Sequence, residues 1–130
     1  VTAMSFPFSL EDSGLFLAFA VCNMGVEINS VESLMDEEIK KVQDQLIDEK
    51  EFQKLQNQME NDFVSENSRV GGIAENLANY YVYFGDTNLI NTELDRFMKV
   101  TREDIQRVAK QYLVKSNRVV LHYLPKSEKK

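Results

Sequence analysis

Leu15-Phe-Leu-Ala-Phe-Ala-Val-Cys22 is the longest apolar stretch of this 130-residue chain. It follows a turn-like Asp12-Ser-Gly14 and precedes the Asn23-Met-Gly25 break, and it is too short for a core helix, so we expect a strand. Its odd-numbered residues are bulky and its even-numbered residues are mostly small, so both faces are apolar and need cover. Residues 3–8 are expected to pair with it as a preceding antiparallel strand, with Pro7 near an edge or a bulge.

Helical patterns follow these strands over most of the chain. Three pairs have the form of an N-terminal cap: Asn29 with Glu32, Asp48 with Glu51, and Thr101 with Asp104. Together with apolar residues at a 3.6-residue period, they predict helices over residues 29–46, 50–67, 71–84, 89–98 and 101–113. Gly71-Gly72 interrupts the long pattern, so we expect either a kink or two separate helices there. Gly85-Asp86 ends the helix before it.

The end of the chain reads as a last strand. Asn117 breaks the final helix, and Arg118-Val-Val-Leu-His-Tyr-Leu124 is a β-branched run that Pro125 stops. The order strand, strand, helices, strand predicts an α+β fold, in which several helices pack on one face of an antiparallel or mixed sheet. We expect the last strand to return to the first ones.

Length and composition limit the organisation and the partners. Residues 1–130 fit one domain, followed at 126–130 by a charged tail, and the first eight residues look like neither a signal peptide nor a natural start, so we expect part of a longer protein. Fifteen basic residues against 21 acidic ones, with the signs interspersed, argue against nucleic acid as the partner. The longest apolar stretch is too short to span a membrane.

No residue type in this sequence points to a self-contained catalytic centre. His122 is the single histidine and Cys22 the single cysteine, so the chain can complete neither a usual zinc site nor an internal disulfide. We expect His122 to be a hydrogen-bonded core or sheet-face residue and Cys22 a small hydrophobe. No G-x-S-x-G or P-loop motif is present. We therefore assign no catalytic, cofactor-binding or metal-binding residue.

Two other clusters have structural interpretations. Asp36-Glu-Glu38 precedes Lys40-Lys41, and Glu37 and Lys41 lie four residues apart, as on a solvated helix face. The run Tyr80-Tyr-Val-Tyr-Phe84 is expected to pack aromatic rings into the core with one or two hydroxyls at the surface, and its alternative is an aromatic binding surface.

The ordered segments of the chain, taken together, resemble a known family. The chain looks like the second half of a domain of the M16 zinc peptidases, the family of pitrilysin, insulysin and the processing peptidases, and its later part looks like the C-terminal segment of long bacterial members. The segments that carry this resemblance are Gly14–Val21, Asp48–Phe63, Glu75–Asp86, Leu89–Asp95, Val100–Leu113 and Asn117–Lys126.

The resemblance implies a fold and a division of labour. In that family, homologous α+β domains derived from a ferredoxin-like unit pair as a clamshell around a closed chamber in which peptides are cut. One domain carries an H-x-x-E-H helix and a distal glutamate that bind zinc, and partner domains often supply an arginine and a tyrosine. This sequence has no H-x-x-E-H, and it has neither Arg nor Tyr in the matching stretch Gly14–Gly25. Zinc in the parent enzyme would therefore be bound by residues outside this chain.

The resemblance leads us to expect a noncatalytic, C-terminal portion of a zinc metallopeptidase that contributes chamber wall and scaffold. Its partners would be the catalytic M16 domain, in the same chain or in a sister subunit, and peptide substrates. Long bacterial relatives are often exported, which would place the parent in the cell envelope or periplasm. The alternatives are a non-peptidase structural core subunit of the same fold, and a helical interaction module that uses residues 50–84.

The burial of one helical region decides whether the chain is an interaction module. The interaction module fails if the apolar stripe of that helical region is buried within the chain; the stripe consists of Phe52, Leu55, Met59 and Phe63. The strand at 15–22 or its neighbour could also have an open edge, and open edges invite pairing, so we expect the chain to self-associate there or through apolar helix surface.

Overall fold

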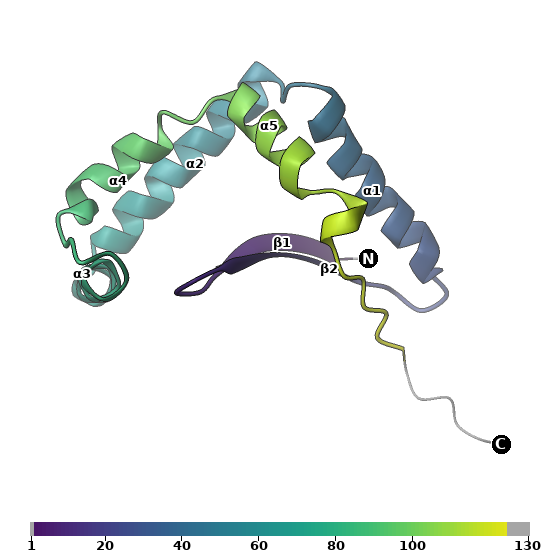
Figure 1. Ribbon diagram of the computed structural model, residues 1–130, viewed down its shortest axis with the longest axis horizontal. Helices are drawn as coiled ribbons and strands as arrows, with labels where there is room; N and C mark the ends of the chain where they lie inside the picture. Colours follow the sequence, from purple (N-terminus) through teal and green to yellow (C-terminus); the bar gives the residue numbers. More distant parts are fainter. Residues whose placement is uncertain (1, 125–130) are drawn as a thin grey trace. The chain divides into compact units, whose positions relative to one another are not determined.

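The computed structural model describes residues 2–124 and confirms the α+β class (Figure 1). The described part contains one two-stranded antiparallel sheet and five α-helices. Its elements are β1 (Thr2–Ser9), β2 (Gly14–Val21), α1 (Ile28–Asp44), α2 (Glu49–Asn67), α3 (Val70–Phe84), α4 (Leu89–Phe97), α5 (Arg102–Tyr112) and a 3₁₀ turn, η1 (Lys115–Asn117).

The described residues form two compact units. Unit 1 contains the residues up to Asp44 and those from Arg107 onward, and unit 2 is Gln45–Gln106. Helix α5 supplies its first turn to unit 2 and the rest to unit 1.

Strands β1 and β2 of unit 1 form the predicted hairpin. Their register runs without a bulge from Thr2 opposite Val21 to Ser9 opposite Gly14. The Leu10 amide donates to the Ser13 carbonyl at 2.8 Å and closes the connection. This confirms the expected antiparallel pairing of residues 3–8 with the apolar stretch that begins at Leu15.

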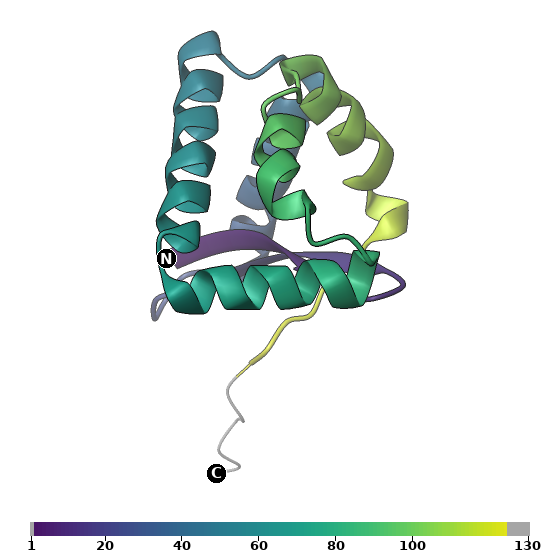
Figure 2. The ribbon, with the colours of Figure 1, turned by 90° about the vertical axis from the view of Figure 1, so that its left-hand side faces the viewer.

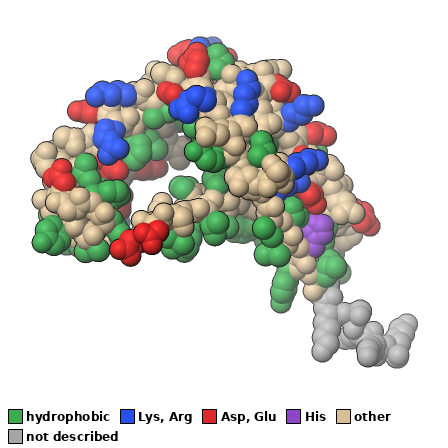
Figure 3. All heavy atoms as spheres, in the orientation of Figure 1, with side chains coloured by type: hydrophobic (Ala, Val, Ile, Leu, Met, Phe, Trp, Pro, Cys, Tyr) green, Lys and Arg blue, Asp and Glu red, His purple; other side chains and the backbone are tan. Residues whose placement is uncertain are grey.

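Both faces of the hairpin are open to solvent in the described structure. On the bulky face Leu15 is 59% and Val21 60% exposed, and on the other face Phe16 is 53% exposed. Figure 3 shows apolar side chains gathered at the surface of the hairpin. Because an isolated two-stranded hairpin is at best marginally stable, β1 and β2 call for apolar cover that residues 2–124 do not supply.

The long helical pattern of unit 2 divides into two helices, as one of the two expected arrangements. Asp48 begins α2, and its carboxylate accepts from the Lys50 amide at 2.9 Å. The chain turns at Ser68 and Arg69, and α3 runs crosswise to α2 (Figure 2). Gly72 makes this turn possible, because a Cβ there would lie 2.1 Å from the Glu66 carbonyl oxygen.

The ends of the later helices follow the expected chemistry. Gly85 ends α3 in the left-handed region at φ 69°. Thr101 and Asp104 form a complete capping box: the Asp104 amide donates to Thr101 Oγ1 at 3.1 Å, and the Thr101 amide donates to the Asp104 carboxylate at 3.2 Å.

One predicted helix boundary and one predicted strand are wrong. Helix α1 begins at Ile28, so Asn29 lies inside its first turn rather than at its cap, because the Glu27 carbonyl already accepts the amides of Ser30 and Val31. The predicted strand 118–124 is not a strand. Arg118 has an extended backbone, with φ −137° and ψ 155°, but this segment pairs with no strand in the described residues. A β-branched run becomes a strand only when a neighbouring strand accepts its backbone bonds.

Candidate functional site

A group of charged side chains in unit 1 joins α1 to η1 and the segment after it. We call it the polar cluster; it consists of Glu32, Asp36, Lys115, Arg118 and His122. Glu32 and Asp36 lie one helical turn apart on α1, so their carboxylates point from the same face.

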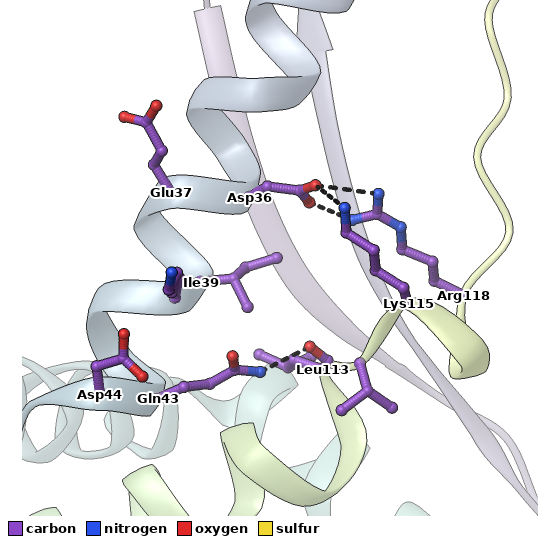
Figure 4. A pocket seen from close by; sticks show the side chains of 10 residues that line it. Asp36, Glu37, Ile39, Gln43, Asp44, Leu113, Lys115 and Arg118 are labelled. Carbon is purple, nitrogen blue, oxygen red and sulfur yellow. Dashed lines mark hydrogen bonds and ion pairs between the residues drawn. The ribbon is translucent and has the colours of Figure 1, made fainter.

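Arg118 is the centre of the polar cluster. Its guanidinium forms a bidentate pair with the Asp36 carboxylate, and its Nη2 also donates to Glu32 Oε1 at 3.1 Å. Lys115 Nζ lies 3.5 Å from the Asp36 carboxylate (Figure 4). The hydrogen bond from Arg118 holds the pKa of Asp36 below its ordinary value, and the same bond raises the pKa of Arg118.

His122 completes the polar cluster, with its Nε2 3.1 Å from Glu32 Oε2. The predicted hydrogen bond is present, but the side chain is 39% exposed and lies on no sheet, so the core or sheet-face placement is wrong. The reason is the missing strand pairing of residues 118–124, which leaves the α1 carboxylates as the nearest polar partners.

An open depression of about 460 Å³ lies beside the polar cluster in unit 1. Gln43 stands in its wall, and its Nε2 donates to the Ala109 carbonyl at 3.1 Å and to the Leu113 carbonyl at 2.8 Å. Figure 4 shows the Gln43 amide turned toward Leu113. These bonds satisfy carbonyls at the C-terminal end of α5, so Gln43 acts as a cap for a neighbouring helix.

The charges around this depression balance. Its wall contains three acidic and three basic side chains, namely Asp36, Glu37 and Asp44 with Lys40, Lys115 and Arg118. Asp36 and Arg118 are already paired with each other, so neither is a free acid, base or anion ligand. The geometry fits a structural tie between α1 and the segment after α5 better than a reaction centre.

The described residues do not fit a zinc ion. No group of three or more His, Cys, Asp or Glu side chains is placed to hold a metal within residues 2–124. His122, the only histidine of the chain, bonds to Glu32, and Cys22 is a half-buried free thiol directly after β2. A usual zinc site needs more nitrogen or sulfur ligands than these two residues offer. We derive no metal-dependent step from this chain.

The aromatic run at the end of α3 divides between core and surface. Tyr80 is buried at 8% exposure, and its hydroxyl donates to the Glu93 carboxylate of α4. Burial, and then Glu93, raise the pKa of Tyr80 to about 12. The other four side chains are 55–70% exposed, so the expectation that the run packs into the core is wrong for Tyr81, Val82, Tyr83 and Phe84. Successive residues of a helix point in different directions, and Tyr80 is the member of this run that is buried and bonds to α4.

On the outer face of α1, Lys41 pairs with Glu38 at 2.6 Å rather than with Glu37. The predicted spacing of four residues is replaced by one of three, which is equally close on a helix. The bond to Glu38 raises the pKa of Lys41. This face is solvated, as expected.

Sequence reasoning did not find Arg118, Glu32, Asp36 or Gln43 as partners across the fold. The available signal was that Arg118 is the lone permanent cation in an apolar run, and that α1 carries two acids one turn apart.

Among residues 2–124, no helix is both long enough and apolar enough to cross a membrane.

Comparisons with known proteins give a fold but no family. No family model matches the chain, and no curated protein sequence matches it. Solved structures share its fold, among them the following two. One is a crystal structure assigned as a zinc protease from Bordetella pertussis Tohama I, with a TM-score of 0.81 and 20% identity, covering 95% of this chain and 68% of that one.

The other structure is a protease from Helicobacter pylori, with a TM-score of 0.81 and 22% identity. The match covers 89% of this chain but only 28% of the Helicobacter chain. At these identities the likeness concerns the fold alone. The chain therefore has an α+β fold found in zinc-protease and protease structures, and it corresponds to part of those longer chains.

Proposed function

We propose that this chain is a noncatalytic, C-terminal portion of a zinc-dependent metalloendopeptidase of the M16 kind, with a role in the wall and scaffold of a closed peptide-degrading chamber. The observation that carries the proposal is the fold match over 95% of this chain to a structure assigned as a zinc protease. The coverage of 28% of the Helicobacter protease supports a part of a longer protein rather than a complete enzyme.

The residue content supports a noncatalytic role. The full sequence has one histidine and no H-x-x-E-H motif, so it lacks the two histidines and the general base of that motif. The charged groups that the fold does bring together, in the polar cluster, are occupied with one another. Zinc and its activated water would come from another domain of the same chain or from a sister subunit.

The burial pattern supports a scaffold. The hairpin has an apolar face on each side and little cover, and Leu55 and Met59 of α2 are 42% and 45% exposed. An apolar surface of this extent on a folded unit marks contact with another protein surface. The exposure on α2 also keeps the alternative of a helical interaction module, because the stripe is not buried within the described residues.

The coding sequence around this chain separates a peptidase from a non-peptidase core subunit. A peptidase requires an H-x-x-E-H motif encoded upstream in the same reading frame or in a neighbouring subunit. A core subunit of the same fold requires none. The peptidase proposal fails if neither location encodes the motif.

Peptide cleavage by the natural full-length product tests the division of labour. We expect that product to cut an unfolded, fluorescence-quenched peptide, and we expect cleavage to stop when the two motif histidines are replaced by alanine. His122→Ala in the same product is the matched control and should leave the rate within about twofold, since His122 is partly exposed and bonds to Glu32 of the polar cluster. Loss of cleavage in His122→Ala would contradict a noncatalytic role for this chain.

A further inference from the structure

The outer edges of β1 and β2 are not equivalent. The Leu10 amide bonds to the Ser13 carbonyl, so the backbone groups of that pair face inward. Inward and outward pairs alternate along an antiparallel ladder. In the β1–β2 register, Pro7 opposite Phe16 therefore belongs to an outward pair, and the nitrogen of Pro7 lies on the outer edge of β1.

Pro7 blocks one edge and leaves the other open. A proline has no N–H to donate and its ring obstructs an incoming strand, so the outer edge of β1 is interrupted in its middle. On β2 the outward residues are Gly14, Phe16, Ala18 and Ala20, and each of them has an N–H. Neither strand contains a charged residue that would oppose pairing. The outer edge of β2 is thus the accepting edge of this hairpin.

The sequence of β2 is complementary to itself about Ala18. In an antiparallel pairing of two copies with Ala18 opposite Ala18, Phe16 lies opposite Ala20, and Leu17 lies opposite Phe19. One face then sets a large ring against a methyl group, and the other sets two large apolar side chains together, which suits directly opposed residues on a sheet. In this register the residues that exchange hydrogen bonds between the two copies are Phe16, Ala18 and Ala20. Their backbone N–H and C=O groups already face the outer edge of β2, so the backbone does not have to change conformation.

We propose that two copies of this chain associate through β2, antiparallel about Ala18, to form a four-stranded sheet with β1 at both outer edges. The arrangement is isologous and closed, because the same edge serves both copies and Pro7 protects the remaining edges. It extends a marginal two-stranded hairpin beyond the three strands that independent stability needs. This inference goes beyond the proposed function and does not depend on it: within a longer protein a strand of that protein competes for the same edge.

Sedimentation velocity of the purified chain over a wide range of concentration tests the association. We expect a monomer–dimer equilibrium and no larger species. Ala18→Pro removes one outward N–H of β2 and should weaken the dimer at least about tenfold. Ser5→Pro is the matched control. Ser5 pairs with Ala18 in the hairpin, but its backbone N–H faces the outer edge of β1, so this substitution should leave the dissociation constant of the dimer within about twofold.

Disulfide cross-linking tests the register and does not depend on the stability of the proline variants. In a Cys22→Ser background, Ala18→Cys places two thiols at a directly opposed pair, about 5.5 Å apart between Cα atoms, which permits a disulfide. Ala20→Cys lies on the same edge and face, but its copy is four residues away along the ladder, about 13 Å, so it should not cross-link. We expect rapid dimer formation under mild oxidation for Ala18→Cys alone.

Three results would overturn the proposal. The first is a strict monomer at all concentrations, whether or not the β2 edge then binds a strand of another protein. The second is equal cross-linking at positions 18 and 20. The third is a series of larger polymers that Ser5→Pro abolishes, because this would show that the β1 edge is used as well.

Discussion

Gly71 and Gly72 are adjacent, yet replacing them with alanine should have opposite effects on the stability of unit 2. Both lie in the first turn of α3. A Cβ at Gly71 would meet nothing within 4 Å, whereas a Cβ at Gly72 would lie 2.1 Å from the Glu66 carbonyl oxygen and 3.0 Å from the Glu66 carbonyl carbon. The pair therefore separates helix propensity from steric contact at almost the same place.

The magnitudes follow from these two environments. Gly71→Ala should stabilise unit 2 by about 0.5–1 kcal/mol, because alanine restricts the unfolded chain and favours the helix. Gly72→Ala receives the same benefit, but the chain between α2 and α3 must shift by more than 1 Å, and overpacking of this kind costs about 1–3 kcal/mol. We expect a net loss of about 1–2 kcal/mol for Gly72→Ala.

Thermal unfolding followed by circular dichroism measures both variants. At about 4 °C or more per kcal/mol for a unit of this size, Gly71→Ala should melt above the wild type and Gly72→Ala several degrees below it. A Gly72→Ala protein that melts at or above the wild-type temperature would refute the close approach of α3 to the Glu66 carbonyl. The Gly71→Ala variant is the control for helix propensity.

Three further perturbations test the contacts described above. Gln43→Ala should lower the free energy of unfolding by about 1–2 kcal/mol in urea titrations, since two bonds to the end of α5 are lost, and Gln43→Glu should cost more because an ionised carboxylate cannot donate. The absorbance of Tyr80 should titrate with a pKa of about 12. Since the folded pKa lies above the ordinary value of 10.0, the contribution of Tyr80 to stability is fully present below pH 10 and is lost as the pH rises toward 12. Tyr80→Phe should remove this pH dependence together with the bond to Glu93. Asp36 has a lowered pKa, so its contribution is present above its ordinary value of 3.8 and is lost as the pH falls below it, and Arg118→Ala should move the Asp36 titration, followed by NMR, back up toward 3.8.

Local signals predicted most of the helices and the hairpin because those elements depend on neighbouring residues. The cap at Asp48, which accepts from the Lys50 amide, and the predicted pair of Thr101 with Asp104 each operate within a single turn. Gly85 ends α3 by its own backbone conformation. The short apolar run Leu15–Cys22, with turn-like residues on both sides, likewise predicted the strand that is observed at Gly14–Val21. Such features can be read from a short window of sequence.

The errors occurred where the outcome depends on distant partners. Residues 118–124 have strand-like composition, but a strand needs a neighbour, and in the described residues Arg118 and His122 bond to α1 instead. Tyr81 and Phe84 are residue types that often pack in a core, but their positions around the axis of α3 leave both side chains exposed. The polar cluster joins residues more than 80 positions apart, and no local pattern indicates such a pairing.

We propose that this chain, which shares its fold with solved zinc-protease and protease structures, binds no zinc itself. A zinc titration of the purified chain tests this most directly. Isothermal titration calorimetry should detect no tight stoichiometric site, and His122→Ala and Cys22→Ser should not change the result. One zinc ion bound tightly per chain, with a tetrahedral protein site in X-ray absorption and loss of binding in either variant, would contradict the account.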